Sequence, residues 1–205
     1  MNKMITLGKI RTSKIELVDI AKSWLALSLA FAFVYSGISL VRGNISGIFG
    51  VLFLKLFVIS LFTAGLGFLL HELAHKFVAQ KYGCAAEFRA FDQMLYLAVG
   101  LAFFIGFIFA APGAVMINGM VTKKENGIIS IAGPLTNYLL AMIFLAISIF
   151  FPAGRFFAEV GAGVNMWLGL FNMIPFGNFD GKKILDWNRY WWFAMVLVGV
   201  YFVFF

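Results

Sequence analysis

Long apolar runs with few charged side chains restrict the fold of this sequence more than any other feature. The first run, residues 23–41, has 19 residues and no charged side chain. Further apolar runs cover about 50–80, 94–120, 128–151, 161–177 and 184–205. A helix needs about 20 mostly apolar residues to cross the hydrocarbon core of a bilayer. The sequence therefore predicts an all-α polytopic membrane protein with about five to six transmembrane helices.

The overall composition supports the same class of protein. Hydrophobic residues make up 62% of the chain and charged residues 12%, and the mean hydropathy is +0.96. A soluble domain of this length could not cover such a sequence with a polar surface. Because there is no repeat and no low-complexity linker, we expect one membrane-embedded domain over residues 1–205. The single Cys84 excludes an intramolecular disulfide and a cysteine-rich zinc site.

Residues 1–22 form a polar, basic segment that we expect to be cytoplasmic or interfacial. Ser13 and Glu16 have the spacing of a capping box, which predicts that a helix begins there and continues into the first apolar run. That run is too long for a signal-peptide core and lacks a small-residue cleavage site, so we expect it to be retained. The net charge of +7 does not indicate a nucleic-acid partner, because the basic residues gather at the ends of apolar runs.

The heptapeptide HELAHKF, residues 71–77, places ionisable groups inside an apolar run. His71 and His75 are the only two histidines, and a separation of four residues puts both on one face of a helix. Glu72 lies beside them, and a carboxylate at bilayer depth costs about 2.5–3.5 kcal/mol unless something offsets it. Two histidines at this spacing with an intervening glutamate are typical of a zinc site whose glutamate is the general base. We therefore predict a metal site here.

A catalytic zinc ion usually has three protein ligands, and the third ligand must here be a carboxylate. Six of the other acidic residues lie in polar stretches or connectors: Glu16, Asp19, Glu87, Asp92, Glu125 and Glu159. Asp180 and Asp186 remain. Asp180 ends an apolar stretch and precedes Gly181, a residue that lets the backbone turn sharply near a site, whereas Asp186 lies next to Trp187. We predict Asp180 as the third ligand.

These motifs together resemble the site-2 protease family of intramembrane zinc metalloproteases. The resemblance covers roughly residues 50–185 and rests on the H-E-x-x-H motif, on Asn172-x-x-Pro175 followed by Asp180-Gly181, and on AGPLTN at 132–137. It implies one Zn²⁺ per chain held by His71, His75 and Asp180. It also implies that Glu72 activates water and that Asn172 helps to bind or polarise the substrate. AGPLTN further suggests a helix that begins near Gly133, with Pro134 in its first turn.

The charge pattern constrains the topology. Five basic residues before the first span predict a cytoplasmic N-terminus, and the 50–80 helix then brings His75 toward the cytoplasmic side. For Asp180 to reach the same side, 94–120 must cross the membrane an even number of times. We expect a re-entrant β-hairpin-like element there, with a strand near Ala114–Ile117, although 94–111 is long enough for an ordinary span. With the re-entrant element, 13 of the 16 basic residues are cytoplasmic, all except Arg42, Lys55 and Arg155.

The sequence thus predicts a multi-pass intramembrane zinc metalloprotease that hydrolyses peptide bonds in or near transmembrane segments of membrane proteins. Its expected partners are a transmembrane protein substrate and the lipid bilayer, with no nucleic acid. The sequence does not predict an oligomeric state. The N-terminus and the active site are expected to face the cytoplasm. The alternative is a non-proteolytic membrane metal-binding protein or transporter, but a transporter needs polar groups along a path, and this chain has one compact cluster.

Overall fold

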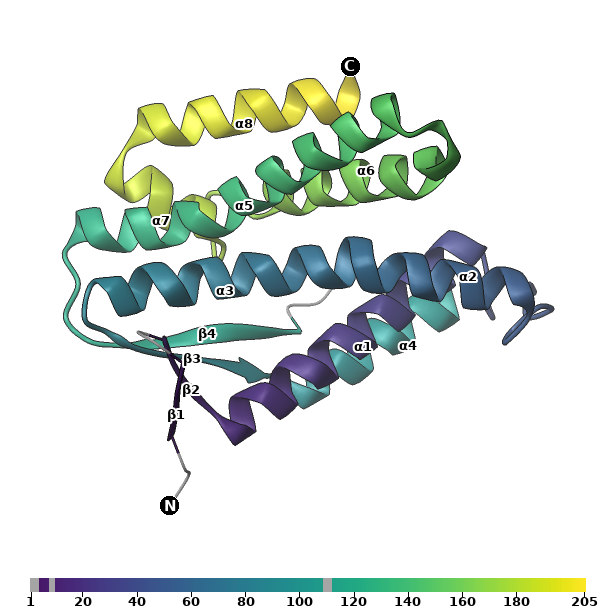
Figure 1. Cartoon of the computed structure of the whole chain (residues 1–205), viewed down its shortest axis with the longest axis horizontal. Coiled ribbons are helices and arrows are strands. Elements are labelled where there is room, and N and C mark those ends of the chain that lie inside the picture. The colour runs from purple at the N-terminus through teal and green to yellow at the C-terminus, as the bar shows by residue number, and fades with distance from the viewer. Residues whose placement is uncertain (1–3, 8–9, 109–111) are drawn as a thin grey trace. The chain divides into compact units, whose positions relative to one another are not determined.

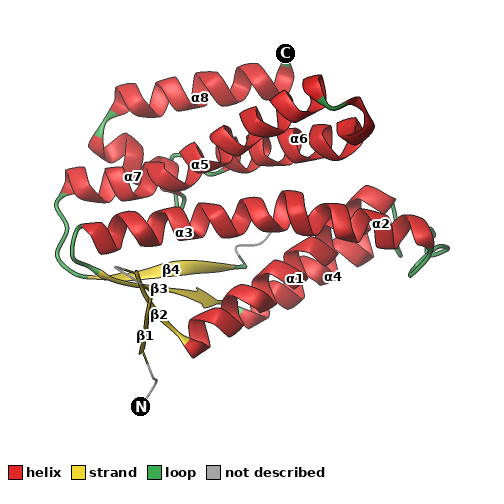
Figure 2. Ribbon diagram, in the orientation of Figure 1, coloured by secondary structure: helices red, strands yellow, loops and turns green. Residues whose placement is uncertain are grey.

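The computed structural model describes residues 4–7, 10–108 and 112–205. Helices dominate the described residues, and two small two-stranded sheets accompany them (Figure 1, Figure 2). The chain divides into two compact units. The first comprises Met1–Leu66 and Phe88–Ala114, and the second comprises Gly67–Glu87 and Val115–Phe205.

The first unit begins with a β-hairpin that leads directly into a long helix. Its elements are β1 (Met4–Leu7), β2 (Ile10–Ser13), α1 (Lys14–Ser36), α2 (Val51–Ser60), the π-helix η1 (Leu61–Gly65) and α4 (Asp92–Ile105). The predicted start of α1 is confirmed, since the Ser13 side chain accepts a hydrogen bond from the Glu16 N–H at 3.2 Å. The antiparallel pairing of β1 with β2 was not expected from the polar composition of residues 1–22.

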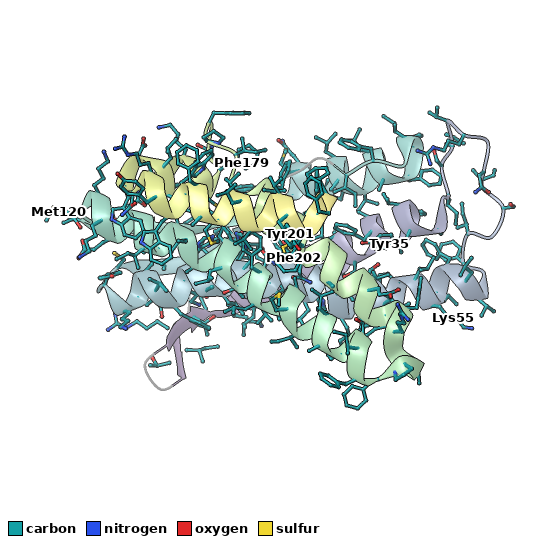
Figure 3. The ribbon with its side chains drawn as sticks, turned by 90° about the horizontal axis from the view of Figure 1, so that it is seen from above. Tyr35, Lys55, Met120, Phe179, Tyr201 and Phe202 are labelled. Atoms are coloured by element: carbon teal, nitrogen blue, oxygen red, sulfur yellow. The ribbon has the colours of Figure 1, made fainter. Side chains whose placement is uncertain are left out.

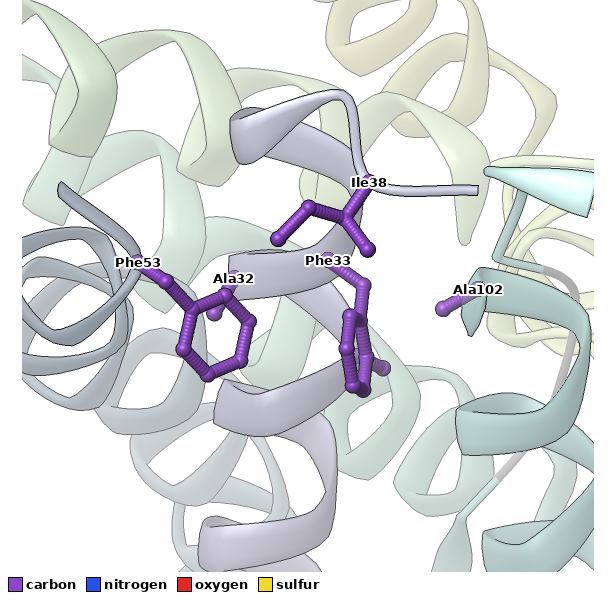
Figure 4. Packing of buried hydrophobic residues seen from close by; sticks show 6 residues of the cluster. Ala32, Phe33, Ile38, Phe53 and Ala102 are labelled. Atoms are coloured by element: carbon purple, nitrogen blue, oxygen red, sulfur yellow. The ribbon is translucent and has the colours of Figure 1, made fainter. Parts of the chain in front are cut away.

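The core of the first unit lies between α1, α2 and α4. Phe33 of α1 packs against Phe53 of α2 with ring centroids 5.1 Å apart, and Ala102 of α4 and Ile38 complete the cluster (Figure 4). The small side chains Ala30 and Ala32 are fully buried, which lets neighbouring helices approach closely. Polar contacts add to this packing, since the Trp24 indole N–H of α1 donates to the Leu61 carbonyl of η1 at 2.8 Å.

The second unit contains the remaining helices. Its elements are α3 (Leu66–Lys81), α5 (Lys123–Phe150), the short 3₁₀ helix η2 (Pro152–Gly154), α6 (Arg155–Phe171), α7 (Asp180–Trp187) and α8 (Arg189–Phe204). Figure 1 shows α5 and α6 side by side, and both α7 and α8 contact this pair. Tyr138, Met166, Met173 and Met195 pack together between these helices with Ile184.

The region 94–120 agrees with the sequence prediction in part. The expected strand is confirmed as β4 (Gly113–Asn118), and its partner is β3 (Ala85–Ala90). The prediction of a β-hairpin-like element within 94–120 is therefore wrong. The partner strand β3 precedes that range, and α4 separates the two strands in the sequence. The Phe91 N–H donates to the Pro112 carbonyl at 3.1 Å, which extends the contact between the two segments beyond the strands.

The start of α5 also differs from the prediction. This helix begins at Lys123, and Pro134 lies in its interior instead of in its first turn. The cause is a capping box, in which the Thr122 hydroxyl accepts from the Glu125 N–H and the Glu125 carboxylate accepts from the Thr122 N–H. Two backbone donors that would otherwise lack partners are satisfied at this position, so the helix starts about three turns earlier than the predicted start near Gly133.

Three of the described helices are long and apolar enough to cross a membrane: Lys14–Ser36, Val51–Lys81 and Lys123–Phe150. Two shorter apolar helices are Asp92–Ile105 and Arg189–Phe204. Large apolar side chains project outward from many helices, including Tyr35 of α1 and Tyr201 and Phe202 of α8 (Figure 3). These features make the chain a membrane protein, and the larger number of about five to six spans stays a prediction.

Candidate metal centre

The two histidines lie one turn apart on α3 and face the interior of the second unit. His71 is 4% exposed and His75 is 7% exposed, and their imidazole centroids are 4.7 Å apart in an edge-to-face arrangement. The helix forms here because leucine, alanine, glutamate, lysine and glutamine, all good helix formers, surround the histidines. The spacing of four residues therefore places both rings on the same buried face, as the sequence predicted.

Asp180, the first residue of α7, meets both histidines. Its Oδ2 atom lies 3.3 Å from His71 Nε2 and 3.1 Å from His75 Nε2. The Gly181 N–H donates to the Asn172 carbonyl at 2.7 Å, and a Cβ at Gly181 would collide with the Met173 backbone. Glycine at this position therefore allows the backbone to approach closely enough to bring Asp180 to the histidines.

The three side chains form a group that could hold a metal ion. Their candidate ligand atoms all lie within 4.8 Å of one another. Ligand atoms about 2 Å from a tetrahedral zinc ion are about 3.3 Å apart, which matches the two histidine–aspartate distances. Two imidazole nitrogens and one carboxylate oxygen are also a donor set found in catalytic zinc sites. The residues present thus fit zinc.

Hydrogen bonds on the far side of each ring orient the histidines. His75 Nδ1 is 2.8 Å from the Ile129 carbonyl, and His71 Nδ1 is 2.6 Å from Asn137 Oδ1. A backbone carbonyl can only accept, so His75 Nδ1 carries the hydrogen and a neutral His75 turns the Nε2 lone pair toward Asp180. That lone pair is the one a neutral His75 would offer to a metal ion.

A glycine on α5 keeps space free beside the imidazoles. A Cβ added at Gly133 would collide with Nε2 of both His71 and His75. Sequence reasoning placed Gly133 in the AGPLTN motif but did not foresee that it lies against both rings. Its position on the ligand-facing side of the imidazoles identifies α5 as one wall of the centre.

Glu72 lies next to the metal-binding group but is not part of it. Its Oε2 atom accepts a hydrogen bond from the backbone N–H of Val115 at 3.1 Å. Val115 is the third residue of β4, so this strand holds the carboxylate of the predicted base. Glu72 as a whole residue is half-buried.

The side chains of Asn172 and Asp186 make other contacts. Asn172 caps the C-terminus of α6, and its side-chain amide donates to the Leu168 carbonyl at 3.0 Å. Its predicted contact with substrate therefore stays a prediction. Asp186 is 54% exposed at its side chain and pairs with Lys182 at 3.3 Å, so it lies on the surface of α7.

Sequence reasoning missed two polar contributors to the centre. Asn137 entered the sequence analysis only as the last residue of AGPLTN, and Asn165 was not singled out. Both are fully buried, and Asn137 Nδ2 donates to Asn165 Oδ1 at 2.9 Å. The signal was present in the sequence, because each is an amide inside an otherwise apolar run and needs buried hydrogen-bond partners.

The fold and this centre together define a membrane protein with a buried site suited to zinc. Comparison with known proteins agrees. The chain is 39% identical over 186 residues to "Putative zinc metalloprotease MJ0611" of Methanocaldococcus jannaschii, and the match covers 89% of each chain. The protein therefore belongs to this family of zinc metalloproteases, and zinc is its metal.

Two more distant relatives carry similar names. The chain is 31% identical to "Zinc metalloprotease MJ0392" of the same organism and 28% identical to "Putative zinc metalloprotease Rip3" of Mycobacterium tuberculosis. The matches cover 90% and 93% of this chain but only 45% of either relative, so the chain spans about half the length of these two proteins. No protein-family model and no solved structure matches the chain.

Proposed function

We propose that the protein is an intramembrane zinc metalloprotease of the site-2 type, which hydrolyses peptide bonds in or near transmembrane segments of membrane proteins. The observation that carries the proposal is the position of Glu72. Glu72 directly follows His71, one of the three potential zinc ligands, on a helix that is long and apolar enough to span a bilayer, and its carboxylate accepts from the Val115 N–H. A metal site that only stores or transports an ion has no need of such a base.

In this proposal His71, His75 and Asp180 hold one zinc ion per chain. When bound, zinc would lower the pKa of a water molecule to about 7 and would polarise a carbonyl group. Glu72 accepts a proton from the water whose oxygen attacks the peptide carbonyl carbon. As the carbon–nitrogen bond breaks, Glu72 returns that proton to the leaving amine nitrogen. The Val115 N–H keeps the carboxylate in place between the two transfers.

The proposed substrate is a transmembrane segment of another protein in the lipid bilayer. Carbonyls of an intact helix are hydrogen-bonded and covered by side chains, so the segment must unwind locally before it is cut. Inside the bilayer, the unwound backbone needs new hydrogen-bond partners. Strand β4 supports this step, since it contacts Glu72 through Val115 and an extended peptide can pair with a strand edge.

We further propose that the chain crosses the membrane several times, with its N-terminus and active site toward the cytoplasm. The segment that connects β3 to β4 is then re-entrant. The basic residues on α5 and α7 then lie on the cytoplasmic side, as the positive-inside rule predicts.

Purified protein can test this function directly. The protein in detergent is incubated with a panel of tagged single-span substrates, with and without a zinc chelator. We expect cleavage of at least one substrate, loss of cleavage with the chelator, and recovery when zinc is added back. Stoichiometric zinc without cleavage of any substrate would instead favour a non-proteolytic metal-binding protein.

A further inference from the structure

Two buried asparagines connect the metal centre to α6. Asn137 on α5 and Asn165 on α6 are both fully buried. Asn137 Oδ1 is 2.6 Å from His71 Nδ1, and Asn137 Nδ2 donates to Asn165 Oδ1 at 2.9 Å. Burial of side-chain amides in an apolar helix bundle costs free energy unless all their polar atoms find partners. The presence of two connected buried asparagines therefore needs an explanation.

The direction of each hydrogen bond follows from two backbone carbonyls, which can only accept. Asn165 Nδ2 donates to the Gly161 carbonyl at 2.9 Å, so the oxygen of Asn165 must face Asn137. Asn137 then meets two acceptors, Asn165 Oδ1 and the Gly67 carbonyl at 3.2 Å, and must present its amino group to both. Its oxygen is left facing His71, and His71 Nδ1 must donate the hydrogen.

This order of donors fixes the tautomer of His71. With the hydrogen on Nδ1, the Nε2 lone pair faces Asp180 and is free to bind a metal ion. The Ile129 carbonyl holds His75 in the same tautomer, because a backbone carbonyl can only accept a hydrogen bond. His71 depends instead on an amide side chain, which could turn over by 180° and offer its amino group.

We propose that Asn165 is a positioning residue that acts through Asn137 to hold His71 in the tautomer and orientation that bind zinc. The proposal rests on the ligand role of His71 in the proposed function. The local packing is built around this contact, because a Cβ added at Gly67 would collide with the Asn165 side-chain oxygen. Asn165 itself lies too deep in the chain of hydrogen bonds to contact zinc, since Asn137 separates it from His71.

The first test is zinc affinity, measured by competition with a chromophoric chelator on detergent-purified protein. Loss of a side chain that orients a metal-bound histidine costs about 10–100-fold in affinity. We expect Asn137→Leu to lose zinc affinity by about this factor and Asn165→Leu by a smaller one. The double variant should be no weaker than Asn137→Leu alone, because Asn165 acts only through Asn137. Multiplicative losses would overturn the proposal.

A matched control separates this effect from loss of packing. Met166 is the neighbour of Asn165 on α6 and is buried at 3% exposure, but its side chain cannot join the hydrogen-bond chain. We expect Met166→Ala to lower the thermal unfolding temperature and leave zinc affinity unchanged. Equal losses of zinc affinity in Met166→Ala and Asn165→Leu would mean that Asn165 contributes packing alone.

The second test reads the tautomer itself. The chain has only two histidines, so histidine-selective ¹⁵N labelling gives NMR signals from His71 and His75 alone. In zinc-loaded wild-type protein both rings should carry hydrogen on Nδ1. In Asn165→Leu the His71 signals should broaden or split while those of His75 stay unchanged. Unchanged His71 signals would overturn the proposal even if Asn137→Leu fails to fold.

The ligand role of His71 is tested separately by His71→Ala, which should lose stoichiometric zinc. Normal zinc content in that variant would overturn the proposed site. The failure of the positioning role would look different: zinc is lost in His71→Ala, yet Asn165→Leu matches the wild type in both zinc affinity and NMR signals.

Discussion

The backbone N–H of Val115 donates to Glu72 Oε2 at 3.1 Å, so a strand holds the carboxylate that lies beside the metal centre. The contact joins β4 to α3 at the residue that we propose as the general base. It also gives β4 a role that does not depend on any side chain of the strand. The position of Glu72 is thereby tied to the same strand that we propose as a pairing edge for substrate.

Removal of this N–H should slow cleavage without loss of zinc. Val115→Pro deletes the donor, and a hydrogen bond to a charged group contributes about 1.5–3 kcal/mol, so we expect cleavage to fall by about 10-fold or more. Val115→Ala keeps the N–H and is the matched control, with a rate close to that of the wild type. Both variants should keep one zinc ion per chain, measured by elemental analysis. Equal rates in the two variants would show that the contact does not position the base.

Asp180 and Asp186 should respond differently to the same substitution. Asp180→Ala removes a buried carboxylate from the metal-binding group and should lower both zinc content and cleavage. Asp186→Ala removes an exposed partner of Lys182 and should leave zinc in place, because surface ion pairs contribute about 0–1 kcal/mol. Zinc content and cleavage are measured on the same preparations. The reverse pattern would refute Asp180 as the third ligand.

A single methyl group on α5 should disturb the metal centre. Gly133→Ala places a Cβ against Nε2 of both histidines, so the rings must move from their positions and zinc affinity should fall. Gly163→Ala on α6 is the control, because a Cβ there meets no atom within 4 Å. That variant should bind zinc normally and be slightly more stable, since alanine favours a helix over glycine by about 1 kcal/mol. Wild-type zinc affinity in Gly133→Ala would contradict the described geometry.

The proposed topology predicts which positions are accessible from outside the cell. In a Cys84→Ser background, cysteines at Lys124 and Lys182 should react with a membrane-impermeant thiol reagent only after cells are opened. A cysteine at Arg155 should react in intact cells. Labelling of position 124 from outside, with position 182 protected, would rule out the re-entrant segment between β3 and β4.

The sequence was sufficient to predict structure where local rules decide it or where few candidate residues of the right chemistry exist. A separation of four residues on a helix placed His71 and His75 on one face, and the Ser13–Glu16 spacing located the start of α1. Elimination among the carboxylates selected Asp180; the structure places this residue beside the histidines, and its role as a zinc ligand stays a prediction. In each case a periodicity or a capping rule acts over a few residues, or few candidates of the right chemistry exist.

The sequence was insufficient to predict structure where contacts between distant segments decide it. The partner of β4 could not be identified, because β3 is separated from it by α4 and strand pairing depends on tertiary context. The link from Asn165 through Asn137 to His71 joins three helices, and periodicity within one helix cannot reveal it. The spacing of Thr122 and Glu125 is that of a capping box and marks the start of α5, but the AGPLTN motif suggested a later start near Gly133.

The most direct test of the central claim compares the wild type with Glu72→Gln. Glutamine keeps the shape of the side chain and is not needed as a ligand, but it cannot accept the proton from water. Zinc content and cleavage of a tagged single-span substrate are measured on the same purified samples. The account predicts one zinc ion per chain in both proteins and a loss of cleavage of about 100-fold or more in the variant. Undiminished cleavage by zinc-loaded Glu72→Gln would contradict it.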